Sequence, residues 1–296
     1  FIEEILRRGR LKIDDFAHTI GAFFFQSDRD FFEEIAKFRA ARRMWYRLLK
    51  ERYHAKDPRS LQLRIHTQTT GRGLTYRQPL NNIIRVTTQV LAAALGGVQS
   101  QHACAYDEAI STPSEESALL SIRTQQIIQH ETNVTNVVDP LGGSYYVEWL
   151  TNEVEKRAWE YFQKIENAGG FVNAVESGWL QREVTESMTD YQRKVQNGEI
   201  KLVGVNCYEM AEELSRVCAF RPNPKTGEIT KDRIEKFKRE RDNDKVKKVL
   251  DELRRVSEHG ENVVSTVIKA AKAGATIGEV GDVWREVFGT WSTPLS

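Results

Sequence analysis

The polar residues in the N-terminal part of the chain gather in three clusters that could bind a ligand. Each cluster follows a short apolar run, and the three are Gln26-Ser27-Asp28, His66-Thr67-Gln68-Thr69-Thr70-Gly71 and Gln99-Ser100-Gln101-His102. Neutral donors and acceptors dominate them. Such groups suit holding a carbonyl, a carboxylate or a ribose better than activating water, so the clusters indicate binding more than hydrolysis.

Each of these residues also has a structural explanation. A histidine at a strand end is often a satisfied structural group, and His66 alone is as consistent with that role as with function. The pairing of His66 with His102, each near a glutamine, favours the functional interpretation. Asp107 and Glu108 could act in a site, but a role in capping a helix that leads to Pro113 is favoured.

A short basic loop carries Lys56, Arg59 and Ser60. These residues could meet a phosphate, although a lone basic loop is usually only solvated. Both interpretations stay open on the residues alone.

Several function classes have no support in the sequence. It contains no G-x-S-x-G elbow, Walker loop or H-E-x-x-H motif, and no cluster with metal-ligand spacing, so no metal site is predicted. The formal net charge of +1 gives no electrostatic case for nucleic acid or an anionic membrane. No apolar run is long enough to cross a bilayer. The three widely spaced cysteines indicate a reduced, cytoplasmic location instead of a disulfide framework.

The elements that must position the clusters alternate between strand and helix. Strands are expected at residues 20–25, 61–66 and 98–105, with helices at 30–53 and 81–95 between them. This alternation is typical of a parallel α/β sheet or barrel, in which polar loops at the carboxyl ends of the strands share one face. After Pro113 the pattern becomes mainly helical, with helices expected at 115–130, 147–167, 171–176 and 231–256, and a helix-turn segment at 263–288.

The predicted fold is the C-terminal part of a (β/α)8 barrel followed by a mainly helical extension. Three strands would leave an open sheet edge, whereas a complete barrel takes roughly 250 residues. We therefore expect barrel strands and helices in 1–112, covering helices in 113–202 and a helical extension in 203–296. Residues upstream of Phe1, or another chain, would complete the barrel.

Several sequence blocks resemble the large subunit of the methylmalonyl-CoA mutase family. The blocks are Leu63-Arg-Ile-His-Thr-Gln-Thr-Thr-Gly, Asn81-Asn-Ile-Ile-Arg-Val, Gly96-Gly-Val-Gln-Ser-Gln-His, Tyr106-Asp-Glu-Ala, Arg123-Thr-Gln-Gln, Asp139-Pro-Leu-Gly-Gly-Ser-Tyr-Tyr-Val-Glu and Val203-Gly-Val-Asn. The resemblance implies a barrel threaded by coenzyme A and a radical rearrangement of an acyl-CoA. It also implies adenosylcobalamin, bound mainly by another domain or a small subunit, and a hetero-oligomer or homodimer.

The resemblance assigns roles to matching residues. It places Lys56, Arg59, Ser60, His66 and Gln68 against the acyl-CoA. It places Gln99, His102 and Glu148 near the cofactor. The family's Gly-Tyr-His catalytic block and its Asp-x-His-x-x-Gly cobalt-ligand signature are not found, so the catalytic residues are expected upstream of Phe1.

One departure from the family concerns the substrate. The family's Ser-Leu-His-Thr-Asn block reads Ser100-Gln101-His102-Ala103-Cys104 here. The change suggests a specialised branch such as 2-hydroxyisobutyryl-CoA mutase. This interpretation predicts an enzyme segment that is inactive alone. One alternative is a non-catalytic scaffold or partner subunit of a cobalamin-dependent mutase complex, and a second is an unrelated barrel enzyme, such as a lyase, with neutral polar site groups.

Overall fold

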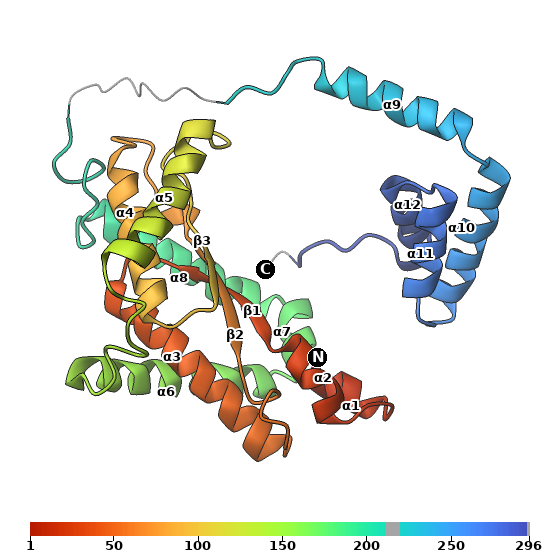
Figure 1. The fold of residues 1–296 in the computed structure, drawn as a ribbon. Coiled ribbons are helices and arrows are strands. Elements are labelled where there is room, and N and C mark those ends of the chain that lie inside the picture. The colour runs from red at the N-terminus through yellow and green to blue at the C-terminus, as the bar shows by residue number, and fades with distance from the viewer. Residues whose placement is uncertain (211–219, 295–296) are drawn as a thin grey trace. The chain divides into compact units, whose positions relative to one another are not determined.

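A computed structural model describes residues 1–210 and 220–294, which form two compact units (Figure 1). The first unit comprises Phe1–Phe220 and the second Arg221–Ser296. The predicted domain boundaries after residues 112 and 202 both fall inside the first unit. Cys218, one of the three cysteines, lies outside the described residues. No helix among the described residues combines the length and apolarity that a membrane crossing requires.

A three-stranded parallel sheet organises the first unit, in the order β1-β2-β3. Its strands are β1 (Ala22–Ser27), β2 (Arg64–Thr69) and β3 (Ser100–His102). β1 and β2 begin two and three residues later than predicted, and β3 is shorter. The clusters expected in loops therefore lie largely on the strands themselves, at their carboxyl ends.

Helices of the crossover connections cover one face of this sheet (Figure 1). They are α3 (Phe31–Arg47), which continues as a π-helical turn η1 (Leu48–Arg52), and α4 (Asn81–Leu95), preceded by the short 3₁₀ turn η2 (Gly71–Gly73). Phe38 of α3 is fully buried and meets Phe25 of β1 edge-on, with ring centroids 6.2 Å apart. Two short helices, α1 (Ile2–Arg7) and α2 (Ile13–Ile20), precede the sheet. The second of them adds Ile13 and Phe16 to the same core.

Four more helices complete the first unit. They are α5 (Glu115–Glu131), α6 (Tyr145–Asn167), α7 (Phe171–Glu176) and α8 (Trp179–Gln196). α6 lies along α3, where Glu155 accepts a hydrogen bond from Arg47 at 2.7 Å and forms an ion pair with Arg43. The helix α8 was not predicted from the sequence.

Four helices are the regular elements among the described residues of the second unit. They are α9 (Thr226–Glu240), α10 (Asn243–Glu258), α11 (Val264–Ala273) and α12 (Ile277–Phe288). The single charged helix expected at 231–256 is two helices, because the extended Arg241 ends the first and Asp242 caps the second by accepting from the Lys245 N–H at 3.0 Å. α10 packs on α11 and α12 through buried Val246, Leu253 and Val256.

One ion pair ties the start of α12 to the end of α9. Arg241, 8% exposed, donates to both carboxylate oxygens of Glu279, and Glu279 also accepts from the Thr276 N–H at 2.8 Å. The Arg241 guanidinium and the Thr276 donors hold the pKa of Glu279 well below its ordinary value. A depressed folded-state pKa means that this stabilisation is present above the unfolded pKa, about 4.3, and is lost as the pH falls toward the folded value.

We therefore expect Glu279→Gln to lower the free energy of unfolding of the second unit at neutral pH by about 2 kcal/mol. Chemical denaturation of the full chain, followed by circular dichroism between neutral and acidic pH, measures this. Glu286→Gln is the matched control, because Glu286 pairs with Arg254 while 60% exposed and should matter by less than about 1 kcal/mol. Equal effects of the two substitutions at neutral pH would contradict the expectation.

Candidate functional site

The face of the sheet opposite α3 and α4 carries two rows of mostly polar side chains, which we call the open face. Successive strand residues point to opposite sides, and in β2 Ile65, Thr67 and Thr69 are buried while His66 and Gln68 are partly exposed. The parallel register aligns Phe24 with His66 and Ser100, and Gln26 with Gln68 and His102. Three strands thus bring six side chains onto one surface.

The first row contains Phe24, His66 and Ser100. The His66 Nδ1 lies 2.5 Å from the Ser100 Oγ. The rings of Phe24 and His66 lie with centroids 5.1 Å apart and planes tilted by 43°. The imidazole is therefore flanked on both neighbouring strands.

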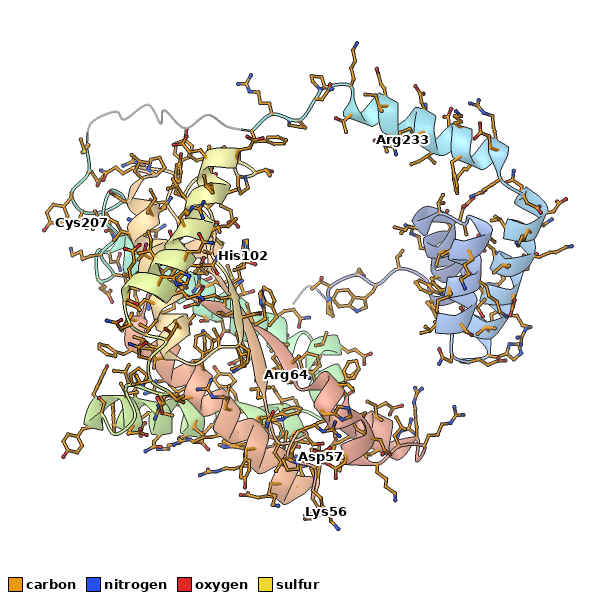
Figure 2. All side chains as sticks on the ribbon, in the orientation of Figure 1. Lys56, Asp57, Arg64, His102, Cys207 and Arg233 are labelled. Atoms are coloured by element: carbon orange, nitrogen blue, oxygen red, sulfur yellow. The ribbon has the colours of Figure 1, made fainter. Side chains whose placement is uncertain are left out.

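The second row contains Gln26, Gln68 and His102. The Gln68 Nε2 donates to the Cys104 Sγ at 3.6 Å, and the Thr70 hydroxyl donates to Gln26 Oε1 at 3.5 Å. His102, at the carboxyl end of β3, is exposed (Figure 2). This row offers amide and imidazole groups, which can donate and accept hydrogen bonds without carrying a fixed charge.

The buried Cys104 supports the second row through its contact with Gln68. Its thiol donates to the Thr69 carbonyl at 2.8 Å, and its backbone N–H donates to the Thr69 hydroxyl at 2.8 Å. Burial raises the pKa of the Cys104 thiol to about 11. The thiol is therefore protonated near neutral pH, whereas nucleophilic chemistry would need a thiolate. Its sulfur instead accepts the hydrogen bond from the Gln68 amide and so supports that side chain.

Gln99 does not join these rows, which corrects the expectation that it shares their surface. It precedes β3, at the amino end of the sheet. Its Oε1 accepts from the Ile65 N–H at 2.6 Å and its Nε2 donates to the Gly97 carbonyl at 3.0 Å. The side chain thus satisfies backbone groups.

The basic loop lies at the amino end of β2, away from His102 (Figure 2). The Asp14 carboxylate accepts from the backbone N–H groups of Lys56 and Asp57, and the Lys56 N–H lowers the pKa of Asp14. Lys56 and Arg59 are exposed, and Arg59 pairs with Asp57 at 2.8 Å. Ser60 is fully buried, so its side chain cannot reach a ligand as was expected from the resemblance.

Glu148 also lies apart from the open face. It sits in the first turn of α6 and accepts from the Gly143 N–H at 3.1 Å and from Arg39 of α3. These two partners hold the pKa of Glu148 below its ordinary value. The structure thus gives Glu148 a role in joining α6 to α3 and does not place it beside His66 or Gln68.

The favoured interpretation of Asp107, a cap of a helix leading to Pro113, is wrong, because residues 106–112 form turns and bends. Asp107 is fully buried, and its Oδ2 accepts from the N–H of Ser114, the residue that caps α5. Gln26, Ser100 and Phe24 join the open face without having been proposed individually. Only the alternation of the strands, read with correct strand ends, could have identified them.

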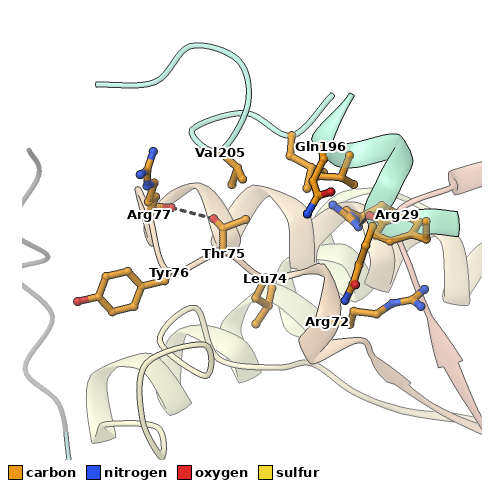
Figure 3. A pocket seen from close by; sticks show the side chains of 12 residues that line it. Arg29, Arg72, Leu74, Thr75, Tyr76, Arg77, Gln196 and Val205 are labelled. Carbon is orange, nitrogen blue, oxygen red and sulfur yellow. Dashed lines mark hydrogen bonds between the residues drawn. The ribbon is translucent and has the colours of Figure 1, made fainter. Parts of the chain in front are cut away.

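A separate groove of about 490 Å³ lies between α8 and the segment that follows β2 (Figure 3). Arg29, Arg72 and Arg77 line its rim, and Leu74 and Val205 are among its apolar residues. None of the predicted site residues lines it. In the part of the chain that the structure describes, no group of three or more His, Cys, Asp or Glu side chains could hold a metal ion.

Comparison with known proteins places the chain in a family. The family model described as methylmalonyl-CoA mutase matches residues 1–290. The chain belongs to the methylmalonyl-CoA mutase family. Among its mutase relatives, the 2-hydroxyisobutanoyl-CoA mutase large subunit of Aquincola tertiaricarbonis is 39% identical over 297 residues, which cover 100% of this chain and 52% of that protein.

Other members of the methylmalonyl-CoA mutase family are similarly related. Methylmalonyl-CoA mutase of Rhizobium meliloti (strain 1021) is 41% identical over 293 residues, covering 99% of this chain and 41% of that protein. The mitochondrial methylmalonyl-CoA mutase of Homo sapiens is 36% identical, with 94% of this chain and 37% of that protein covered. The chain therefore spans about half, or less, of the length of these relatives.

Proposed function

We propose that the chain is part of the large subunit of an adenosylcobalamin-dependent acyl-CoA mutase, an isomerase that rearranges the carbon skeleton of a short branched acyl-CoA. The open face carries this proposal: His66, Gln68 and His102 stand together at the carboxyl end of a parallel sheet in a chain of the mutase family. In barrel enzymes, this end of the strands holds the active site.

The sheet is proposed to form part of the wall of a (β/α)8 barrel. Its helices cover one face, and the other face carries the polar rows that would line the barrel interior. β1 is an edge strand whose Phe23 is 41% exposed beside an apolar depression lined by Trp159 and Phe162. On α8, Val184 and Met188 are exposed one turn apart. Further strands and helices alongside β1 would bury both surfaces, and the relatives carry additional polypeptide that could supply them.

The positions of the polar groups fit a long ligand. Lys56 and Arg59 lie at the amino end of β2, and His66 and Gln68 lie toward its carboxyl end. A six-residue strand spans roughly 20 Å. An extended acyl-CoA could place its phosphates near the basic loop and its acyl group near the open face, whereas a compact metabolite could not reach both.

The residues present fit the outer side of an adenosylcobalamin site better than a cobalt-binding site. Gln26, Gln68 and His102 offer neutral donors and acceptors that suit ribose hydroxyls and amide groups. When bound, adenosylcobalamin supplies the radical chemistry. This chain's residues would bind and orient the acyl group and help to exclude water from it. The cobalamin itself would be held mainly by another domain or a small subunit, a proposal supported by the name of the Aquincola relative, which is a large subunit.

The substrate is proposed to be methylmalonyl-CoA or 2-hydroxyisobutyryl-CoA. The names of the two relatives above support both. Cys104 stands where the family's usual block has asparagine, and it contacts Gln68, so the support of this glutamine differs from the usual family pattern. This difference favours the 2-hydroxyisobutyryl type. A cytoplasmic location is proposed on the cysteine pattern.

A chimera tests the proposal directly. Residues 1–296 would replace the matching part of the Aquincola tertiaricarbonis large subunit, and the chimera would be combined with adenosylcobalamin and that enzyme's cobalamin-binding partner. We expect isomerisation of one of the two acyl-CoA substrates that stops when adenosylcobalamin is omitted, measured by chromatography of the acyl-CoA products. A folded chimera that binds its partner but converts neither substrate would favour the scaffold alternative.

A further inference from the structure

The imidazole of His66 is fixed by contacts on both of its neighbouring strands. Ser100 Oγ meets His66 Nδ1 at 2.5 Å from β3, and the Phe24 ring packs against the imidazole from β1. The parallel register places these three residues directly opposite one another. The ring therefore has one nitrogen engaged and the other, Nε2, without a hydrogen bond among the described residues.

The hydroxyl decides which ring nitrogen carries the proton. A neutral imidazole has one N–H donor and one bare nitrogen acceptor, and a serine hydroxyl can donate a single proton. An imidazole nitrogen is a far stronger base than a hydroxyl oxygen, so the stronger pairing has the Ser100 O–H donating to Nδ1. The proton of the neutral ring then resides on Nε2.

We propose that Ser100 is a positioning residue that fixes His66 in the Nε2–H tautomer and turns this N–H toward the open face as a hydrogen-bond donor. Its target is an acceptor oxygen of the acyl-CoA, and this part of the inference rests on the function proposed above. Phe24 limits rotation of the ring, and Ser100 selects the proton position. Ser100 itself need not touch the ligand.

Nuclear magnetic resonance of the full chain tests the tautomer without any enzyme activity. Two-bond ¹H–¹⁵N correlation spectra at a pH where His66 is neutral distinguish a protonated from a bare Nδ1. Wild type should show a bare Nδ1. Ser100→Ala should lower the ratio of the Nε2–H to the Nδ1–H tautomer about fivefold, the equivalent of one hydrogen bond of about 1 kcal/mol. The signals of His102, which lies two residues after Ser100 on β3, serve as the internal reference.

A second pair of variants separates the hydroxyl from packing. Threonine and valine have nearly the same shape and both suit a strand, but only threonine keeps the hydroxyl. Ser100→Thr should retain the wild-type spectrum of His66, and Ser100→Val should reproduce that of the alanine variant. This comparison remains available if Ser100→Ala fails to fold.

The results separate the inference from the proposed function. A proton on Nδ1 in the wild type, or a His66 spectrum unaffected by loss of the hydroxyl, would overturn the positioning role. In the chimera, Ser100→Val should lower kcat about fivefold or more and Ser100→Thr should restore it. If the spectra change as expected but the folded wild-type chimera is inert, Ser100 still positions His66 and the mutase proposal fails.

Discussion

Replacing His66 by alanine in the active chimera is expected to lower kcat by about 100- to 1,000-fold. This is the loss seen when a preorganised donor to a reacting oxygen is removed from a site closed to water. The substitution should leave the melting temperature nearly unchanged, because the side chain is partly exposed and its hydrogen bond is to the exposed Ser100. Steady-state kinetics and differential scanning calorimetry on the same preparation measure the two quantities.

Gln99→Ala is the matched control for this substitution. Gln99 is also polar and lies next to Ser100, but its amide serves the backbone groups of Ile65 and Gly97. Its removal should cost about 1 kcal/mol of stability and leave kcat within a few-fold of wild type. The reverse pattern, a slow Gln99 variant and an unimpaired His66 variant, would show that the site lies elsewhere on the sheet.

The largest effect on stability is expected for Glu155→Ala. Glu155 is 4% exposed on the inner face of α6, where only Val147, Thr151 and Glu155 are buried. It accepts hydrogen bonds from Arg47 and, at 3.4 Å, from the Trp159 indole, and it forms an ion pair with Arg43. The substitution leaves two arginines without their buried partner and opens a gap between α6 and α3. We expect a loss of about 3 kcal/mol in the free energy of unfolding of the first unit, measured by urea denaturation.

Glu160→Ala provides the comparison on the same helix. Glu160 is exposed, so its loss should change the free energy of unfolding by less than about 0.5 kcal/mol. Similar effects of the two substitutions would mean that α6 does not depend on the Glu155 cluster for its place on α3.

The elements with strong periodicity could be predicted from the sequence. The helix at 81–95 matches α4 residue for residue, because its apolar stripe ends at Gly96-Gly97. The alternating parallel α/β order was likewise predictable. The charged stretch around Asp242 was not resolved into two helices, since its charge pattern runs on without a break and only the cap geometry marks the division.

The site was only partly predictable because its composition depends on strand ends. Side chains alternate with a period of two, so residues an odd number of positions apart on a strand point to opposite faces of the sheet. Gln99 and His102 were grouped in one cluster although they are three residues apart, and Ser100 was left without a role of its own. His66 and Gln68 were identified correctly as neighbours of one surface because both lie on β2 itself. Glu148 and Ser60 were assigned by resemblance, but local contacts occupy Glu148 and Ser60 is fully buried.

The exposure of the open face means that His66 and Gln68 are hydrated in this chain by itself. In a completed barrel the same groups would experience a much lower dielectric constant, which strengthens each hydrogen bond and raises the penalty for any group left unpaired. The isolated chain and the closed assembly are thus two solvent conditions for one arrangement of side chains. Their comparison would separate what the strands impose on these residues from what enclosure adds.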